Sequence, residues 1–152
     1  AFVFEPYARM AQLPSPVTQI YEIGKVWPFP CMVVITTDDM LKKDRDAVNR
    51  MLDAQKEAID MLQKDPQKAA DYITPRFIQG ESFKTQSGEV KATSVIKDSI
   101  ASQTFNWEIT PDQIKRMQEI ADIMIAQKAL DKPVKVEDIL DLSWQQQQQA
   151  KK

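Results

Sequence analysis

Few residues of this chain have the types and spacing that catalysis or metal binding requires. The 152-residue sequence contains no histidine and a single cysteine, Cys31. The lack of histidine excludes Ser-His and Cys-His nucleophile pairs and histidine-containing metal sites from these residues. The three glycines form no phosphate-binding loop. We therefore predict that the chain is not an enzyme, and we expect no catalytic residue, no metal and no cofactor.

Two acidic pairs could be taken for paired catalytic carboxylates. Asp38 and Asp39 precede a short helical pattern, and Asp44 and Asp46 begin a long one. Acidic side chains at helix starts accept hydrogen bonds from free backbone N–H groups and are favoured by the helix dipole. We interpret both pairs as helix caps.

Glu5, Tyr7 and Trp27 are the candidate ligand-binding residues. Glu5 follows the predicted strand 1–4 and begins a helix, and ligands of open α/β sheets collect at the carboxyl ends of strands. Its carboxylate could accept a hydrogen bond from a ligand amine or hydroxyl, or simply favour the first helical turn. Tyr7 and Trp27 could stack on a ligand, or pack in a core or hinge.

The stretch from Cys31 to Leu62 predicts one β-α unit. Residues 31–36 (CMVVIT) are apolar and rich in β-branched side chains, which is typical of a strand buried on both faces. On this interpretation Cys31 is a small core residue. From Asp44 to Leu62, apolar residues recur at helical spacing opposite a charged face, which predicts an amphipathic helix. A buried strand followed by such a helix indicates an α/β fold.

The rest of the chain reads as short strands, helices and loops. Strand or extended segments are expected at 1–4, 17–23 and 104–109, with a stiff proline-rich linker at 25–30. Helices are expected from Pro6 to Pro14-Ser-Pro16, from Asp65-Pro66 to Thr74-Pro75, over 90–102, and from Thr110-Pro111 to about Leu130. Residues 77–88 are expected to form a loop that turns at Gly80 and Gly88, and residues 136–142 to form a short helix or turn. Trp144 is expected to be the last buried residue, before the polar, frayed residues 145–152.

Composition excludes several classes of partner. The formal net charge is −2, and lysines are interleaved with acids, so no basic stripe for nucleic acid is present. No apolar run is long enough to span a bilayer.

The late helices have no predicted strands to cover, so part of a sheet is expected to be absent. The chain opens on the apolar residues 1–4 without a signal peptide, and we expect it to belong to a longer protein.

Taken in order, these pieces resemble the solute-binding proteins of ABC transporters, in the family of receptors for nitrate, sulfonates, taurine and thiamine precursors. The similar stretches are AFVFEPYARMAQ at 1–12, the residues from Trp27 to Ile73, and within them the helix start DPQKAA at 65–70. The family fold, of the type II periplasmic-binding-protein kind, has two α/β lobes joined by crossing strands, with the ligand between them. Closure of the lobes presents the loaded receptor to the membrane permease.

The resemblance implies a division of the chain and a set of partners. Residues 1–24 would end the second lobe, 25–30 would form the crossing and hinge, 31–144 would return to the first lobe, and 145–152 would be a disordered Gln-rich tail. Glu5 and Tyr7 match the family's cleft-facing helix start. The implied partners are a small organic anion or zwitterion, the permease and the missing N-terminal lobe. The implied location is periplasmic or extracellular, with membrane contact only through the permease or a lipid anchor.

Two other functions stay open. An enzyme of pyrimidine or thiamine metabolism on the same fold would need a reactive histidine or a metal cluster, which only the absent half could hold. A helical protein-interaction module would use the exposed face of the helix at 44–64 and the Gln-rich tail, and would fold without additional strands.

Overall fold

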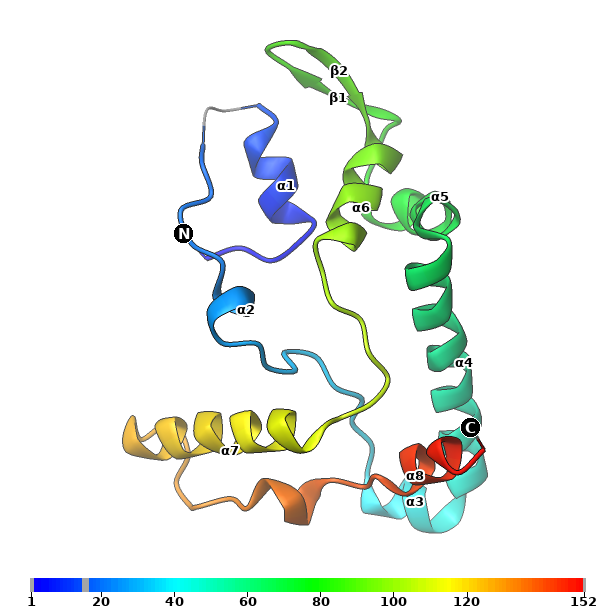
Figure 1. Cartoon of the computed structure of the whole chain (residues 1–152), viewed down its shortest axis with the longest axis vertical. Helices are drawn as coiled ribbons and strands as arrows, with labels where there is room; N and C mark the ends of the chain where they lie inside the picture. Colours follow the sequence, from blue (N-terminus) through cyan, green and yellow to red (C-terminus); the bar gives the residue numbers. More distant parts are fainter. Residues whose placement is uncertain (1, 15–16, 152) are drawn as a thin grey trace. The chain divides into compact units, whose positions relative to one another are not determined.

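The computed structural model describes residues 2–14 and 17–151, and these are mostly helical with one small sheet (Figure 1). The chain is therefore helix-rich, with a small antiparallel sheet beside the helices. Of the β-α unit expected at 31–62, the helix is present and the strand is not. The elements, in order, are α1 (Tyr7–Gln12), α2 (Ile23–Val26), α3 (Asp38–Lys43), α4 (Arg45–Lys64), α5 (Pro66–Phe77), β1 (Ser82–Thr85), β2 (Gly88–Lys91), α6 (Ala92–Ala101), α7 (Pro111–Ala126), the 3-10 helix η1 (Val136–Ile139) and α8 (Ser143–Gln149).

The chain divides into two compact units. The first unit contains Ala1–Ile20 and Gln55–Phe105, and the second contains Tyr21–Ala54 and Asn106–Lys152. Helix α4 contributes its first half to the second unit and its second half to the first. Its start confirms the prediction for Asp44, whose carboxylate accepts a hydrogen bond from the Ala47 N–H at 3.0 Å.

The core of the first unit lies where α5 and α6 pack side by side (Figure 1). Ala70 and Ala92 are fully buried, and such small residues let two helices approach closely. Around them the core consists of Ala69, Ile78, Ile96 and Ile100, with Met10, Met61, Leu62, Ile73, Phe83 and Phe105 packed at its edge. Val95, Ile96 and Ile100 are buried on one face of α6, inside the helix expected over 90–102; that helix begins at Ala92 rather than at Val90, which lies in β2. Tyr72 lies on the exposed face of α5.

Helix α5 begins where the sequence predicts but ends later. Asp65 accepts a hydrogen bond from the Lys68 N–H, and Pro66 occupies the first turn. The prediction that Thr74-Pro75 closes the helix is wrong, because α5 continues to Phe77. The Ile78 N–H donates to the Thr74 carbonyl at 2.9 Å and Ile78 is buried, so core packing holds the helix past its proline.

A β-hairpin stands where a loop was predicted. Strands β1 and β2 pair antiparallel, with Phe83 opposite Val90 and Thr85 opposite Gly88. Gly80 lies in a bend before β1, as predicted, whereas Gly88 is the first residue of β2 and follows the turn at 86–87. Their φ values are +109° and +130°, a region open mainly to glycine. The hairpin forms because Phe83 covers the α5–α6 core from one face of the ribbon.

The second unit is organised by α7, α8 and the first half of α4. Thr110 and Gln113 form a complete capping box at the start of α7, as their spacing predicts. The helix ends at Ala126, a turn before the predicted Leu130. Trp144 is buried as predicted, its ring meets that of Trp107 edge to face at 5.6 Å, and its indole donates to Asp53 at 2.9 Å.

The predicted frayed end of the chain is helical through Gln149. The side-chain amide of Gln145 forms two hydrogen bonds with the backbone of Ile109. Its Oε1 accepts from the Ile109 N–H, and its Nε2 donates to the Ile109 carbonyl. Gln148 donates to Asp53 at 3.0 Å. These hydrogen bonds give polar residues a fixed place that their low-complexity composition did not indicate. Lys152 lies outside the described residues.

The predicted strands at 2–4 and 31–36 are not formed, and both segments lie at the surface. Phe2 is 90% exposed, Phe4 is 78% exposed and Ile35 is 87% exposed. Cys31, predicted to be a core residue, is also exposed. The predicted segments 17–23 and 104–109 likewise contain no strand. The extended linker predicted at 25–30 begins only after Val26, because Lys25 and Val26 belong to helix α2. Strands need partners, and within the described residues β1 and β2 pair only with each other. Ala1, Ser15 and Pro16 lie outside the described residues.

Candidate ligand-binding residues

Glu5 has a carboxylate oxygen that is buried and lacks a hydrogen-bond partner. Its Oε1 lies 3.7 Å from Arg9 Nε, while the buried Oε2 receives no hydrogen bond within the described part of the chain. The side chain as a whole is 19% exposed. A buried carboxylate oxygen without a donor is costly. A hydrogen-bond donor from outside these residues would relieve that cost.

Tyr7 begins helix α1 and is 54% exposed. The helix is short, and its partly buried Met10 packs against the core of the first unit. The phenol therefore lies at the surface, beside Glu5 in sequence and in the same unit. Its exposed ring is free to stack on another molecule or chain. The prediction that Tyr7 contacts a ligand stays a prediction.

Trp27 belongs to the second unit and already has protein partners. Its indole N–H donates to Glu119 Oε2 on α7 at 3.2 Å, and its ring lies 5.3 Å from that of Phe29. The residue is half-buried. These contacts give its polar and apolar atoms a structural use, which favours the hinge-packing interpretation over stacking on a ligand.

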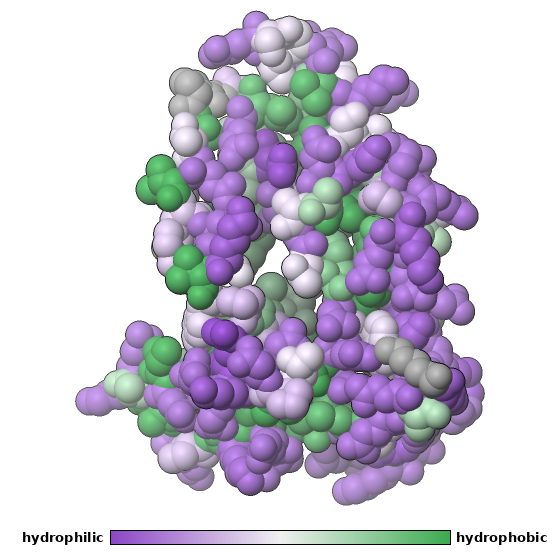
Figure 2. Space-filling view, in the orientation of Figure 1, coloured by the Kyte–Doolittle hydropathy of each residue, from purple (hydrophilic) through white to green (hydrophobic). Residues whose placement is uncertain are grey.

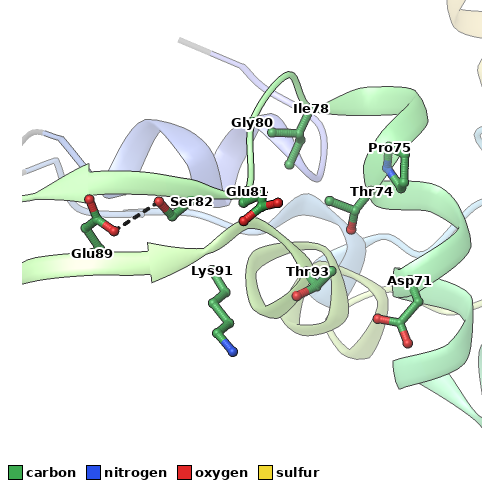
Figure 3. A pocket seen from close by; sticks show the side chains of 10 residues that line it. All are labelled: Asp71, Thr74, Pro75, Ile78, Gly80, Glu81, Ser82, Glu89, Lys91 and Thr93. Atoms are coloured by element: carbon green, nitrogen blue, oxygen red, sulfur yellow. Dashed lines mark hydrogen bonds between the residues drawn. The ribbon is translucent and has the colours of Figure 1, made fainter.

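A surface depression of about 690 Å³ lies in the first unit, between the end of α5, the hairpin and the start of α6 (Figure 3). It is lined by Asp71, Thr74, Pro75, Ile78, Gly80, Glu81, Ser82, Glu89, Lys91 and Thr93. The three carboxylates come from α5, from the loop before β1 and from β2, and in Figure 3 they do not converge on one point. Within the described residues no group of three or more acidic or cysteine side chains could hold a metal ion.

The residues that line this depression were not among the predicted site residues, because residues 77–88 were expected to be a loop. The signal was present in SFKT and GEVK, which flank a polar turn and have Phe83 and Val90 at matching positions. The hairpin brings Glu89 within reach of Ser82, whose hydroxyl donates to Glu89 Oε2 at 3.2 Å. The Ser82 hydroxyl and one Glu89 oxygen therefore bind each other and are less available to a ligand in the depression.

The groups with shifted pKa values form ion pairs on helix surfaces or at helix ends rather than a reactive cluster. The Lys64 amine lowers the pKa of Asp60, and Glu137 and Asp138 raise the pKa of Lys135. Hydrogen bonds from Ser143, assisted by the Arg45 guanidinium, lower the pKa of Asp141 to about 2. Each shift favours the charged form of a paired group, as in structural ion pairs.

Comparisons of the chain with protein-family models, with curated proteins and with solved structures found no match. Across residues 2–14 and 17–151, no helix is both long enough and apolar enough to cross a bilayer.

Proposed function

We propose that this chain is part of the extracytoplasmic solute-binding component of an ABC importer. The observation that carries the proposal is that two segments with the composition of buried strands lie exposed at the surface, outside any sheet. They are residues 2–4 of the first unit and 31–36 of the second. A larger sheet, supplied by the rest of a two-lobed type II binding protein, would give both segments partners.

The segment 31–36 shows most clearly why a sheet is required. Among the described residues, its backbone N–H and carbonyl groups form no backbone hydrogen bond. Met32 and Ile35 are almost fully exposed, and Val33 and Val34 are partly exposed. Uncharged, β-branched segments with open backbone groups pair readily with other strands. Val17 and Ile20, in the coil that precedes α2, are also exposed. Figure 2 shows several hydrophobic side chains at the surface of the chain.

The roles within the proposed receptor follow from the order of the pieces. Residues 25–30, with Pro28 and Pro30, would be the crossing between the lobes, and 31–36 would enter the sheet of the first lobe. The chain would bind its solute only together with that lobe, because closure requires ligand contacts on both walls of the cleft. The permease would recognise the closed form. No enzymatic activity is part of this proposal.

Glu5 indicates the chemical class of the solute. Among residues 2–14 and 17–151 no group donates a hydrogen bond to its Oε2, so a solute that brings an N–H group would satisfy it. A zwitterion such as an aminosulfonate, or an aminopyrimidine, fits this requirement better than nitrate, which has no donor. Tyr7, exposed near Glu5 in sequence, would line the same wall, and its ring could stack on an aminopyrimidine.

Calorimetric titration tests the proposal. The product of the complete gene is titrated with taurine, with the hydroxymethyl aminopyrimidine precursor of thiamine, and with nitrate. We expect saturable binding of one amine-bearing probe, with Kd on the order of micromolar, to the complete protein and none to the 152-residue chain. Saturable micromolar binding to the 152-residue chain by itself would contradict the proposal.

A substitution at Glu5 tests the assignment of the solute. In the complete protein, Glu5→Gln removes the charge and should weaken binding of the amine-bearing probe about 10- to 100-fold. Glu57→Gln, an exposed acid on α4, is the matched control and should leave Kd unchanged. Unchanged affinity in Glu5→Gln would remove Glu5 from the ligand site while leaving the receptor proposal in place.

A helical protein-interaction module is the second candidate. The observation that favours it is that α5 and α6 bury a core of their own, while α4 leaves Met51 52% exposed. This candidate predicts a sharp, two-state melt of the 152-residue chain and no dependence on further strands. The receptor proposal predicts a lower melting temperature for the 152-residue chain than for the complete protein, in which a sheet would bury residues 2–4 and 31–36.

A further inference from the structure

The linker before the exposed segment 31–36 is attached to α7 by a specific hydrogen bond. The Trp27 indole N–H donates to Glu119 Oε2 at 3.2 Å, between residues 92 positions apart in the chain. Both residues belong to the second unit and both are half-buried. The indole N–H is the single hydrogen-bond donor of the Trp27 side chain, and the Glu119 carboxylate accepts it, so the donor of the indole is satisfied.

The aromatic neighbours of Trp27 reinforce this attachment. The Phe29 ring packs against the indole with centroids 5.3 Å apart and planes tilted by 41°. Phe29 and Pro30 are half-buried, whereas every residue from Cys31 to Met40 is exposed. Burial therefore stops at Pro30. A hydrogen bond to a carboxylate is stronger than one between neutral groups, and partial burial strengthens it further.

The two prolines of the linker limit the backbone conformations available between Trp27 and Cys31. Pro28 and Pro30 each fix their own φ, and each restricts the residue before it to extended conformations. The backbone from Trp27 to Cys31 therefore has few rotations left. Once the indole is held on α7, the position and direction in which the chain leaves Pro30 are largely determined.

We propose that Trp27 and Glu119 form a latch that fixes the path of the linker 27–30 and so sets where the segment 31–36 departs from the second unit. With the latch closed, the linker is held at α7 through the Trp27–Glu119 hydrogen bond. With the latch open, the linker and the apolar segment beyond it move independently of the helix. Resting on the proposed function, the latch would set the resting position of the hinge between the lobes.

A nitroxide label on Cys31, the single cysteine of the chain, reports directly on the latch. In the 152-residue chain, Glu119→Leu should make the label more mobile, with a rotational correlation time shorter by about twofold or more. Glu119→Gln keeps a carbonyl oxygen as acceptor and should restore the original line shape. Trp27→Phe keeps a ring but removes the donor, so it should reproduce the effect of Glu119→Leu.

Asp122→Leu is the matched control, since Asp122 lies on the same helix and accepts a hydrogen bond from Gln118 rather than from Trp27. It should leave the label unchanged. Far-UV circular dichroism confirms that each variant retains its helices. An unchanged spectrum in a folded Glu119→Leu chain, or equal mobility in Glu119→Leu and Glu119→Gln, would overturn the latch. The measurement needs no solute, so its failure is separate from a failure of the receptor proposal.

Discussion

Two regions of this molecule have similar apolar sequences but very different environments. In α6, Val95 and Ile96 are buried, with Ile96 only 2% exposed. In the segment 31–36, Val34 and Ile35 have the same side-chain types and lie exposed. The helix finds its partner α5 close by in the chain, so its burial is local. A strand needs another strand, and a parallel one usually comes from far along the sequence.

The largest expected effect tests this difference directly. Ile96→Ala removes a buried side chain and leaves a cavity, so it should lower the free energy of unfolding by about 2–5 kcal/mol. Ile35→Ala makes the same chemical change at an exposed site and should alter that free energy by about 0.5 kcal/mol or less. Urea unfolding followed by circular dichroism measures both. Equal losses in the two variants would show that 31–36 is buried in solution.

Helix caps extend the comparison between locally held and unpartnered segments to smaller free energies, because a cap depends only on residues adjacent in sequence. Thr110→Ala removes the side-chain half of the capping box of α7 and should cost about 1 kcal/mol. Thr104→Ala lies in the extended segment before it, where the residue is exposed, and should cost a few tenths of a kcal/mol, about 0.5 at most. Thermal melts of the two variants give the contrast. A cost at Thr104 matching that at Thr110 would mean that the extended segment is also specifically held.

The smallest expected effect concerns Asp141, which ties the start of α8 to Arg45 at 2.8 Å. Its pKa falls from 3.8 to about 2 in the folded chain. Because the folded pKa is lowered, the stabilisation is complete above the unfolded value and is lost as the pH falls from about 4 to about 2. Solvent screening at this surface pair limits it to about 0.5–1 kcal/mol.

Asp141→Asn checks this pH dependence. The variant should lack the part of the acid-induced loss that occurs between pH 4 and about 2, when unfolding free energies are compared across that range. Asp138→Asn, at an exposed pair with Lys135, is the control and should keep the full dependence. An unchanged acid profile in Asp141→Asn would assign the dependence to other carboxylates.

The features predicted correctly from sequence are those that a few neighbouring residues determine. Asp44, Asp65 and Thr110 begin helices as predicted, because each cap accepts from an N–H a few positions away. Gly80 bends the chain as predicted, because its φ of +109° favours glycine. Each of these predictions depended on local chemistry alone.

The predictions that were wrong concerned contacts with distant residues. The apolar pattern of 31–36 gives no information about whether a partner strand is present in these 152 residues. Gln145 appeared to be part of a frayed tail because its hydrogen bonds reach Ile109, which lies 36 positions away. The helix α5 passes Pro75 because Ile78 packs into the core, which the proline signal alone could not indicate.

In the candidate site, too, the local features were predicted correctly and the contacts with distant residues were not. Glu5 and Tyr7 were chosen for their place at a helix start, and α1 does begin beside them, at Tyr7. The unpaired Oε2 of Glu5 depends on its burial, which the sequence did not give. The bond from Trp27 to Glu119 joins residues 92 positions apart, so the local sequence indicated stacking on a ligand or packing in a core or hinge, but not this partner.

Hydrogen exchange at residues 31–36 tests the central claim most directly. It is measured on the 152-residue chain and on the product of the complete gene, with the amides of α6 as an internal reference. We expect the amides of 31–36 to exchange without protection in the chain alone and to be protected in the complete protein, where a sheet would bind them. Unprotected exchange of 31–36 in both proteins would contradict the account.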